Sequence, residues 1–392
     1  MEDCEIAVSG AGSVGAALAL GLARLGLGVT LIESRSRGVF GKDRRRFVLS
    51  ELSAQWLGQI GVWNEMQGSL KPIHSIRVDE PGTRPVHFEA REIGLPTLGY
   101  AVDAAQLARA FERAIRSEPG IRLLEGARIR RMGPGEPRGS MEIESGSGTT
   151  AIPAPRLLVV AEGQVSSFLD EQGFNIRTRD SGQSALVIRL QGLTGVTQDR
   201  VSERLGPEGL LALLPESASE ATLTWTLRRD RAETFLANPP AEQCLTLSRL
   251  LDLPAEGLGL IEAPTRFDLI RRHIDPPYRE GILVIGQAAH SVAPFAAQGM
   301  NLAWRDARIL VTRLSEARQA GCDFGSAEWL KGYWQGRRSD HRRVGQLTES
   351  LPRLFESRSP FVRRARRSGW QVVRTVPLLR RAILRFGLGW NP

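Results

Sequence analysis

The first 33 residues place a glycine-rich turn between apolar segments, a pattern typical of a β-α-β unit. Residues 4–9 (CEIAVS) predict a short buried strand, and residues 16–24 contain no helix breaker before Gly21 and predict a helix. Residues 28–32 predict a second strand. Short continuous apolar runs of this kind are typical of fully buried strands. The chain therefore begins as an α/β protein.

The hydrophobic pattern changes in the middle of the chain. A helix is predicted for residues 101–116, after which residues 183–190 and 221–228 alternate with a period of two. In the second of these strands, leucine and tryptophan occupy one face and threonine the other. A buried strand returns at residues 281–285, followed by a turn and a helix predicted for residues 299–317.

This order of elements predicts a discontinuous Rossmann-like nucleotide-binding domain with an inserted, mostly antiparallel β-sheet. A ligand is expected to lie between the two sheets. We assign residues 1–72, 97–180 and 275–350 to the nucleotide-binding domain, residues 73–96 and 181–274 to the inserted substrate sheet, and residues 351–392 to a basic helical tail.

Composition narrows the classes of protein that are compatible with this pattern. The 392 residues are 42% hydrophobic and 24% charged, as in a globular protein. Three scattered cysteines suggest neither a disulfide framework nor a metal site, and no metal is predicted. The amino terminus lacks a signal-peptide pattern, and no apolar run reaches the roughly 20 residues that span a bilayer. We expect a cytoplasmic protein that is not integral to a membrane.

The positive charge is concentrated at the carboxyl end. The chain carries a net charge of +9, and residues 351–392 account for all of it with ten arginines and a single acid, Glu356. Apolar and aromatic residues recur among these arginines at spacings of three and four, and Pro377 divides them into two helix-length pieces. Such basic amphipathic helices are typical of anionic membrane surfaces.

Two other interpretations of the tail remain open. The helices can pack on the body of the protein and leave only a solvated basic face. Binding to nucleic acid is disfavoured, because the basic residues lie in one tail and no recognition motif accompanies them. Our expectation is peripheral attachment to the inner face of the membrane through residues 351–392.

The turn between the first strand and helix matches a dinucleotide fingerprint, G-x-G-x-x-G. Gly10 permits the tight turn, Gly12 lets the backbone approach a pyrophosphate, and Gly15 allows close packing of helix on strand. Glu33 ends the second strand, 18 residues beyond Gly15, where a carboxylate can accept hydrogen bonds from the adenosine ribose. These four residues predict a dinucleotide site.

A second motif lies in residues 281–306, GILVIGQAAHSVAPFAAQGMNLAWRD. With the glycine fingerprint and the Asp43-Arg44-Arg45 segment, it makes the chain resemble flavoprotein aromatic hydroxylases of the para-hydroxybenzoate hydroxylase fold, and within them the ubiquinone-biosynthesis hydroxylases. The resemblance covers nearly the whole chain and implies FAD as cofactor. The further residues that it places at the flavin are Arg45, Gly286, Gln287, Pro294, Gly299, Met300 and Asn301, with Pro294 and Ala297 lining the oxygen pocket.

Three positions depart from the family pattern. Glu162 replaces an aspartate, and Gln287 replaces the carboxylate that would accept bonds from the flavin ribityl chain more strongly than an amide can. Ala297 replaces a glycine, at a cost of about 1 kcal/mol if the backbone there has positive φ. His290 and Asp306 are interpreted as structural. No residue is assigned as catalytic, because the flavin itself is expected to carry the chemistry.

The resemblance implies an FAD-dependent monooxygenase that hydroxylates the aromatic ring of a polyprenylated ubiquinone precursor, with NAD(P)H left open as the reductant. A lipophilic aromatic substrate, an anionic membrane surface and other quinone-biosynthesis proteins are the expected partners. The three departures keep a second hypothesis open, a catalytically silent lipid-binding or scaffold protein of a quinone-synthesis complex. A flavin-dependent reductase or halogenase is a further alternative, although no W-x-W-x-I-P halogenase sequence occurs.

Overall fold

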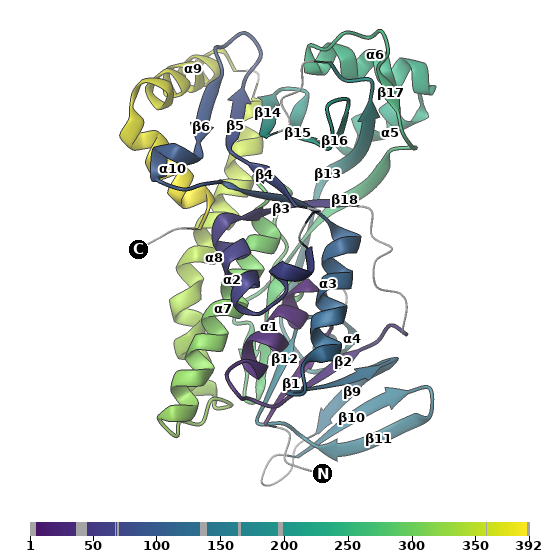
Figure 1. The fold of residues 1–392 in the computed structure, drawn as a ribbon, viewed down its shortest axis with the longest axis vertical. Helices are drawn as coiled ribbons and strands as arrows, with labels where there is room; N and C mark the ends of the chain where they lie inside the picture. Colours follow the sequence, from purple (N-terminus) through teal and green to yellow (C-terminus); the bar gives the residue numbers. More distant parts are fainter. Residues whose placement is uncertain are drawn as a thin grey trace.

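A computed structural model describes residues 5–36, 45–66, 68, 70–133, 139–163, 166–194, 199–357 and 359–389. A six-stranded sheet in the order β19-β20-β12-β1-β2-β8 forms its lower layer (Figure 1). All neighbours are parallel except β19 and β20. The strands are β1 (Ile6–Ser9), β2 (Val29–Glu33), β8 (Ile121–Glu125), β12 (Leu157–Val160), β19 (Tyr278–Arg279) and β20 (Ile282–Val284).

Both faces of this sheet are covered, which explains its continuous apolar strands. Ile6 and Val8 face a core formed with α1 (Ser13–Ala23), α3 (Ala104–Ser117) and α7 (Gln298–Gln319). Ala7 faces the opposite core, which a small antiparallel sheet and α4 complete. The elements of that second layer are β9 (Ala127–Gly133), β10 (Ser140–Ser145), β11 (Gly148–Pro153) and α4 (Ser167–Glu171).

The upper layer is a larger sheet in the order β17-β13-β16-β15-β14-β5-β6, with β18 paired to β13. Its pairs are antiparallel except β14 with β5. The strands are β5 (Ser75–Asp79), β6 (Val86–Glu89), β13 (Ile176–Gln191), β14 (Arg200–Gly206), β15 (Gly209–Pro215), β16 (Glu220–Arg228), β17 (Gly259–Leu260) and β18 (Thr265–Ile274), and helices α5 (Arg229–Ala237) and α6 (Pro240–Leu251) lie beside them.

The period-two prediction for β16 is confirmed. Leu223, Trp225 and Leu227 lie in the core beneath α5 and α6, whereas Thr222 and Thr224 line a cavity on the opposite face. The predicted mixed α/β fold with an inserted, mostly antiparallel sheet is therefore present.

A three-stranded sheet, β3-β7-β4, connects the two layers. Its strands are β3 (Arg46–Ser50), β4 (Lys71–Ile73) and β7 (Gly99–Asp103), and α2 (Glu51–Gln59) follows β3. The helix predicted for residues 101–116 was wrong at its start, because residues 101–103 belong to β7. The side chain of Asp103 then caps α3 by accepting from the Gln106 N–H. Three short 3-10 helices complete the fold, η1 (Trp63–Met66), η2 (Ala90–Ile93) and η3 (Gly286–Ala288).

The carboxyl end consists of three helices beside the upper sheet. α8 (Ala327–Glu356) is a long helix that runs along one side of the molecule (Figure 1). The predicted start of the basic tail, Leu351, therefore lies within this helix and not at its end. α9 (Pro360–Thr375) and α10 (Pro377–Gly387) follow, separated at Pro377 as predicted. Among the described residues, no helix is both long enough and apolar enough to cross a bilayer.

Candidate cofactor site and substrate cavity

A cavity of about 2140 Å³ lies between the lower sheet and the upper one. It begins at the glycine turn after β1, passes the segment before α7 and ends at the carboxyl-terminal helices. Every predicted site residue lines it except Gly15. Segments that are far apart in the sequence therefore form one continuous space.

The glycine turn has the geometry of a phosphate cradle. Gly10 has a φ of 98°, and a Cβ there would lie 2.7 Å from the carbonyl oxygen of Ala161. Gly12 is the N-cap of α1, which has no side-chain cap, and a Cβ on Gly12 would meet nothing within 4 Å. The N–H groups that begin α1 can therefore bind an anion. Gly15 has the packing role predicted for it, since its Cβ would lie 1.9 Å from the Gly10 carbonyl oxygen.

Glu33 lies beside this turn and is buried. Its carboxylate accepts from the Ala11 N–H at 2.8 Å and from the Arg35 N–H at 2.9 Å. Burial alone raises the pKa of Glu33, but the Arg35 side-chain and backbone hydrogen bonds, the Arg35 charge and the Ala11 N–H hold it below the usual value. Glu33 is thus an ionised acceptor. The Arg35 side chain is half exposed, so a ribose hydroxyl can replace its contacts at little cost.

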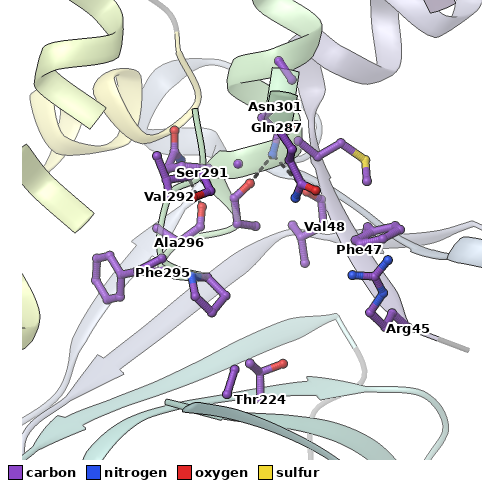
Figure 2. Close-up of a pocket in the computed structure, with 18 of the residues that line it drawn as sticks. Arg45, Phe47, Val48, Thr224, Gln287, Ser291, Val292, Phe295, Ala296 and Asn301 are labelled. Carbon is purple, nitrogen blue, oxygen red and sulfur yellow. Dashed lines mark hydrogen bonds between the residues drawn. The ribbon is translucent and has the colours of Figure 1, made fainter. Parts of the chain in front are cut away.

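Arg45 lines the cavity, and Figure 2 shows it close to the ring of Phe47. Its guanidinium carbon is 5.3 Å from the ring centre of Phe47 and 5.6 Å from that of Phe267 on β18. This places a cation where residues of the lower and upper layers meet. The preceding motif residues Asp43 and Arg44 lie outside the described residues.

The segment from Gly286 to Asn301 forms another wall. Gln287 is exposed to the cavity from η3, and Pro294 also lines it. Both Ala296 and Ala297 have a φ of 50°, the left-handed conformation that disfavours a Cβ by about 1–2 kcal/mol per residue. Ala297 therefore has the positive φ under which a Cβ at this position carries a cost. The adjacent Ala296 shares this strain.

Helix α7 begins directly after these alanines. Ala297 is its N-cap and supplies no side-chain acceptor, and Gly299 and Met300 line the cavity. Their N–H groups belong to the first turn, which has no intrahelical acceptors, so they can stabilise negative charge on a flavin edge.

The Asn301 side chain has a different role. It accepts from the Ser50 N–H at 3.0 Å and the Ser53 hydroxyl at 2.8 Å, and it donates to the carbonyls of Val48 and Ala297 (Figure 2). With all of these bonds made, the amide fastens β3 to the start of α7. Asn301 therefore contributes to a cofactor site indirectly, because its side chain holds the surrounding backbone in position.

Glu162 lies two residues after the end of β12 and lines the same cavity. The hydroxyl of Ser9, at the end of β1, donates a hydrogen bond to its carboxylate. The longer side chain thus ties neighbouring strand ends together next to the glycine turn.

His290 and Asp306 lie behind this wall and do not line the cavity. Asp306 is buried and accepts from Arg337 at 2.7 Å and from His341 at 2.9 Å. Burial opposes ionisation, but the charges of His341 and Arg337 hold the Asp306 pKa well below its usual range. Burial lowers the pKa of His290 to about 3, so it is neutral. The structural interpretation of both residues agrees with this geometry.

Donor atoms of His290, Asp306 and His341 also lie within 4.8 Å of one another, a grouping that the sequence analysis did not foresee. His341 lies on α8, 35 residues beyond Asp306, so no local sequence motif could predict that the two side chains meet. The guanidinium of Arg337 already neutralises the carboxylate and repels a second cation. We therefore interpret the group as a charge network.

The far wall of the cavity was not predictable from any motif in the sequence. Apolar residues of α8, α9 and α10 form it, and Glu203 lies on the floor. The sequence predicts an apolar stripe in the tail at a membrane surface, and the structure places part of that stripe in the cavity wall. One pattern in the sequence could have identified Glu203. It alternates with Val201 and Leu205, so it is a carboxyl group on an otherwise apolar face of a strand.

The described residues fit FAD. The uncapped start of α1 suits the diphosphate, Glu33 the adenosine ribose, and Gln287 with the start of α7 the flavin end.

A family model of the FAD binding domain matches residues 3–344. The chain is 29% identical to 3-demethoxyubiquinol 3-hydroxylase of Escherichia coli, with 98% of both chains covered. It is 30% identical to ubiquinone hydroxylase UbiL of Rhodospirillum rubrum, over 98% of this chain and 89% of that one. Among solved structures, p-nitrophenol 4-monooxygenase PnpA from Pseudomonas putida shares the fold with a TM-score of 0.79 and 15% identity, covering 98% and 97% of the two chains. The chain belongs to the FAD binding domain family, as the flavin-hydroxylase resemblance predicted, and its cofactor is FAD.

Proposed function

We propose that the protein hydroxylates the aromatic ring of a polyprenylated ubiquinone precursor. One observation carries this proposal beyond the family: the cavity continues from the cofactor cradle to an apolar wall made by the carboxyl-terminal helices. The ubiquinone hydroxylases among its relatives support the same reaction class.

The apolar wall suits a substrate with a long hydrocarbon tail. Its large apolar members come from all three helices and from Leu388 directly after α10, namely Leu347, Leu351, Leu354, Phe355, Trp370, Val372, Val373, Leu379, Ile383, Leu384, Phe386 and Leu388. Leu354, Val372, Leu379 and Ile383 are also exposed at the surface. Lining residues that are exposed in this way provide an apolar path for a lipid from the outside to the cavity.

Different residues of the chain bind the cofactor and stabilise charge on it. When bound, FAD supplies the redox chemistry that activates dioxygen. The start of α1 and Glu33 would anchor it, and Gly299 and Met300 would offer N–H groups to developing negative charge. NAD(P)H is the proposed reductant.

The test is a single-turnover reaction with purified protein. We expect FAD to copurify, giving a yellow protein, and a 2-polyprenylphenol to gain one oxygen atom from isotopically labelled dioxygen after reduction with NADH or NADPH. A colourless protein that takes up no FAD and still binds the lipid would favour the silent scaffold. Reduction of FAD with dithionite but not with NAD(P)H would leave the hydroxylase proposal intact and reject the nicotinamide.

We further infer that α9 and α10 bind an anionic membrane surface at the inner face of the membrane. Phe361 and Leu378 are 81% and 73% exposed beside basic residues. At least two of the ten arginines are instead paired within the protein. Arg366 is buried and donates to Glu80 at 2.8 Å, and Arg380 pairs with Glu92 at 2.8 Å. Other quinone-biosynthesis proteins remain proposed partners.

Reversing three exposed charges tests the membrane contact. Arg363, Arg364 and Arg367 are exposed on α9, and changing all three to Glu is expected to weaken binding to phosphatidylglycerol vesicles by at least tenfold at low salt. The matched control changes Arg122, Arg131 and Arg177, which are exposed elsewhere, to Glu. Cosedimentation measures both. Equal losses would indicate only a net-charge effect, and no loss in either variant would leave α9 as a solvated face.

A further inference from the structure

Glu203 places a carboxyl group on the floor of the cavity. Val201, Glu203 and Leu205 of β14 all line the cavity, whereas the alternate residues do not. Because strand side chains alternate between faces, the Glu203 side chain points into this space. Its apolar neighbours on the same strand make it the exception on that face.

The sheet register shows where Glu203 lies relative to the cofactor segment. Glu203 pairs with Val78 on one side and Ala212 on the other, and Ala212 pairs with Thr224. All four line the cavity, so they form one row across its floor. Figure 2 shows Thr224 on the sheet opposite Phe295 and Ala296. Neighbouring strands are roughly 4.8 Å apart, which puts Glu203 about 10 Å from Thr224.

Within the described part of the chain, no ion pair or hydrogen bond engages the Glu203 carboxyl. The ionisable residues of β5, Arg77 and Asp79, alternate with the cavity-lining Val78 and so lie on the other face, as does Arg204 of β14. Strand β15 has no ionisable residue, and the α8 residues that line the cavity are apolar. On α9, Arg366 lines the cavity but is paired with Glu80.

Burial, with no contributing charge, raises the pKa of Glu203 to about 7. An isolated carboxyl group in apolar surroundings costs stability unless it finds a partner. A general base works best when its pKa lies close to the working pH. A ligand hydroxyl entering the cavity would provide the missing partner.

We propose that Glu203 accepts a hydrogen bond from a ring hydroxyl of the substrate and takes its proton during hydroxylation. The O–H bond breaks, the proton passes to the Glu203 carboxylate, and the electron pair remains on the phenolate oxygen, where it enriches the ring that is attacked. When the attacked ring carbon has formed its new C–O bond, its C–H bond breaks and the proton goes to water, and the Glu203 proton returns to the phenolic oxygen in the product. This assignment rests on the proposed function, which supplies dioxygen and reduced FAD.

A pair of probes tests the contact by binding alone. In the FAD-loaded protein, 2-prenylphenol is expected to bind at least tenfold more tightly than its O-methyl ether, since a hydrogen bond to a charged group has that magnitude. Flavin absorbance reports both titrations. Because the ionised carboxylate accepts a stronger hydrogen bond than the neutral carboxyl group, the preference should grow as the pH rises through about 7. In Glu203→Gln the preference should shrink and lose its pH dependence.

Glu256→Gln is the control, because Glu256 is exposed in a loop away from the cavity. It should preserve the preference of the wild type. If the wild type binds phenol and ether equally well, the Glu203 proposal is wrong while the hydroxylase proposal stands. If the wild type binds neither probe, both proposals are wrong.

The pH dependence of stability provides a readout that needs no substrate. Glu203 has a folded-state pKa above its usual value of 4.5, so the folded state holds the proton more tightly and wild-type stability falls as the pH rises from about 4.5 to 7. Glu203→Gln cannot suffer this loss. Its melting temperature should therefore exceed that of the wild type by a margin that grows over this interval and then levels off. An equal margin at pH 5 and pH 8 would overturn the proposal.

Discussion

Changing Arg337 to methionine is expected to lower the free energy of unfolding by about 3–5 kcal/mol. Arg337 is 5% exposed, and its Nε donates to the Asp306 carboxylate at 2.7 Å. Without the guanidinium, a buried carboxylate keeps His341 as its remaining side-chain partner and loses much of its compensation. Denaturant unfolding of the purified protein measures the loss.

Two further variants separate burial from ion pairing as the cause. Arg313 pairs with Glu316 at 3.3 Å, but both side chains are half exposed or more, so Arg313→Met should cost less than about 1 kcal/mol. The double variant Arg337→Met with Asp306→Leu removes both charges and should recover much of the stability. A loss for Arg337→Met no larger than that for Arg313→Met would show that the buried pair contributes little.

Changing Glu33 to alanine is expected to weaken FAD binding by about 1.5–3 kcal/mol, a factor of about 10–150. The carboxylate is an ionised acceptor beside the glycine turn, and its loss also leaves the buried Ala11 N–H without its acceptor. Equilibrium titration of the deflavinated protein with FAD measures the affinity.

Glu125 provides the matched control for this experiment. It lies directly opposite Glu33 on the neighbouring strand β8, but it pairs with Arg116 at 2.7 Å and does not line the cavity. Glu125→Ala should leave FAD affinity unchanged, and Glu33→Gln should lose less than Glu33→Ala because an amide still accepts. Equal affinities of Glu33→Ala and the wild type would remove Glu33 from the cofactor site.

Features that depend on neighbouring residues were predictable from the sequence. The turn at Gly10 and the packing at Gly15 follow from which backbone shapes tolerate a Cβ, and the spacing to Glu33 follows from one helix and one strand. The period of two in β16 likewise identified which side chains face the same way. The flavin end followed from the family resemblance of residues 281–306.

Other features depended on residues that only folding brings together. Residues 101–103 suit a helix by pattern, yet β7 forms because it pairs with β3 and β4. Asn301 links the start of α7 to β3 and α2, because the Ser50 N–H and the Ser53 hydroxyl, about 250 positions earlier, donate hydrogen bonds to its side chain. Long-range pairing overrides local preference in such places.

The sequence by itself therefore determined the α/β class, the cradle and the cofactor, since these follow from periodicity, glycine stereochemistry and motif. The tertiary structure decided which charges are buried and what they meet. Arg366 belongs to a basic tail by sequence, but folding carries it to Glu80, 286 positions away, and buries the pair. Glu203 resembles any other strand glutamate until the sheet register places it among the residues that line the cavity. The free-energy cost of a charged side chain depends on its burial and on its hydrogen-bond and ion-pair partners, and both are fixed only when distant segments pack.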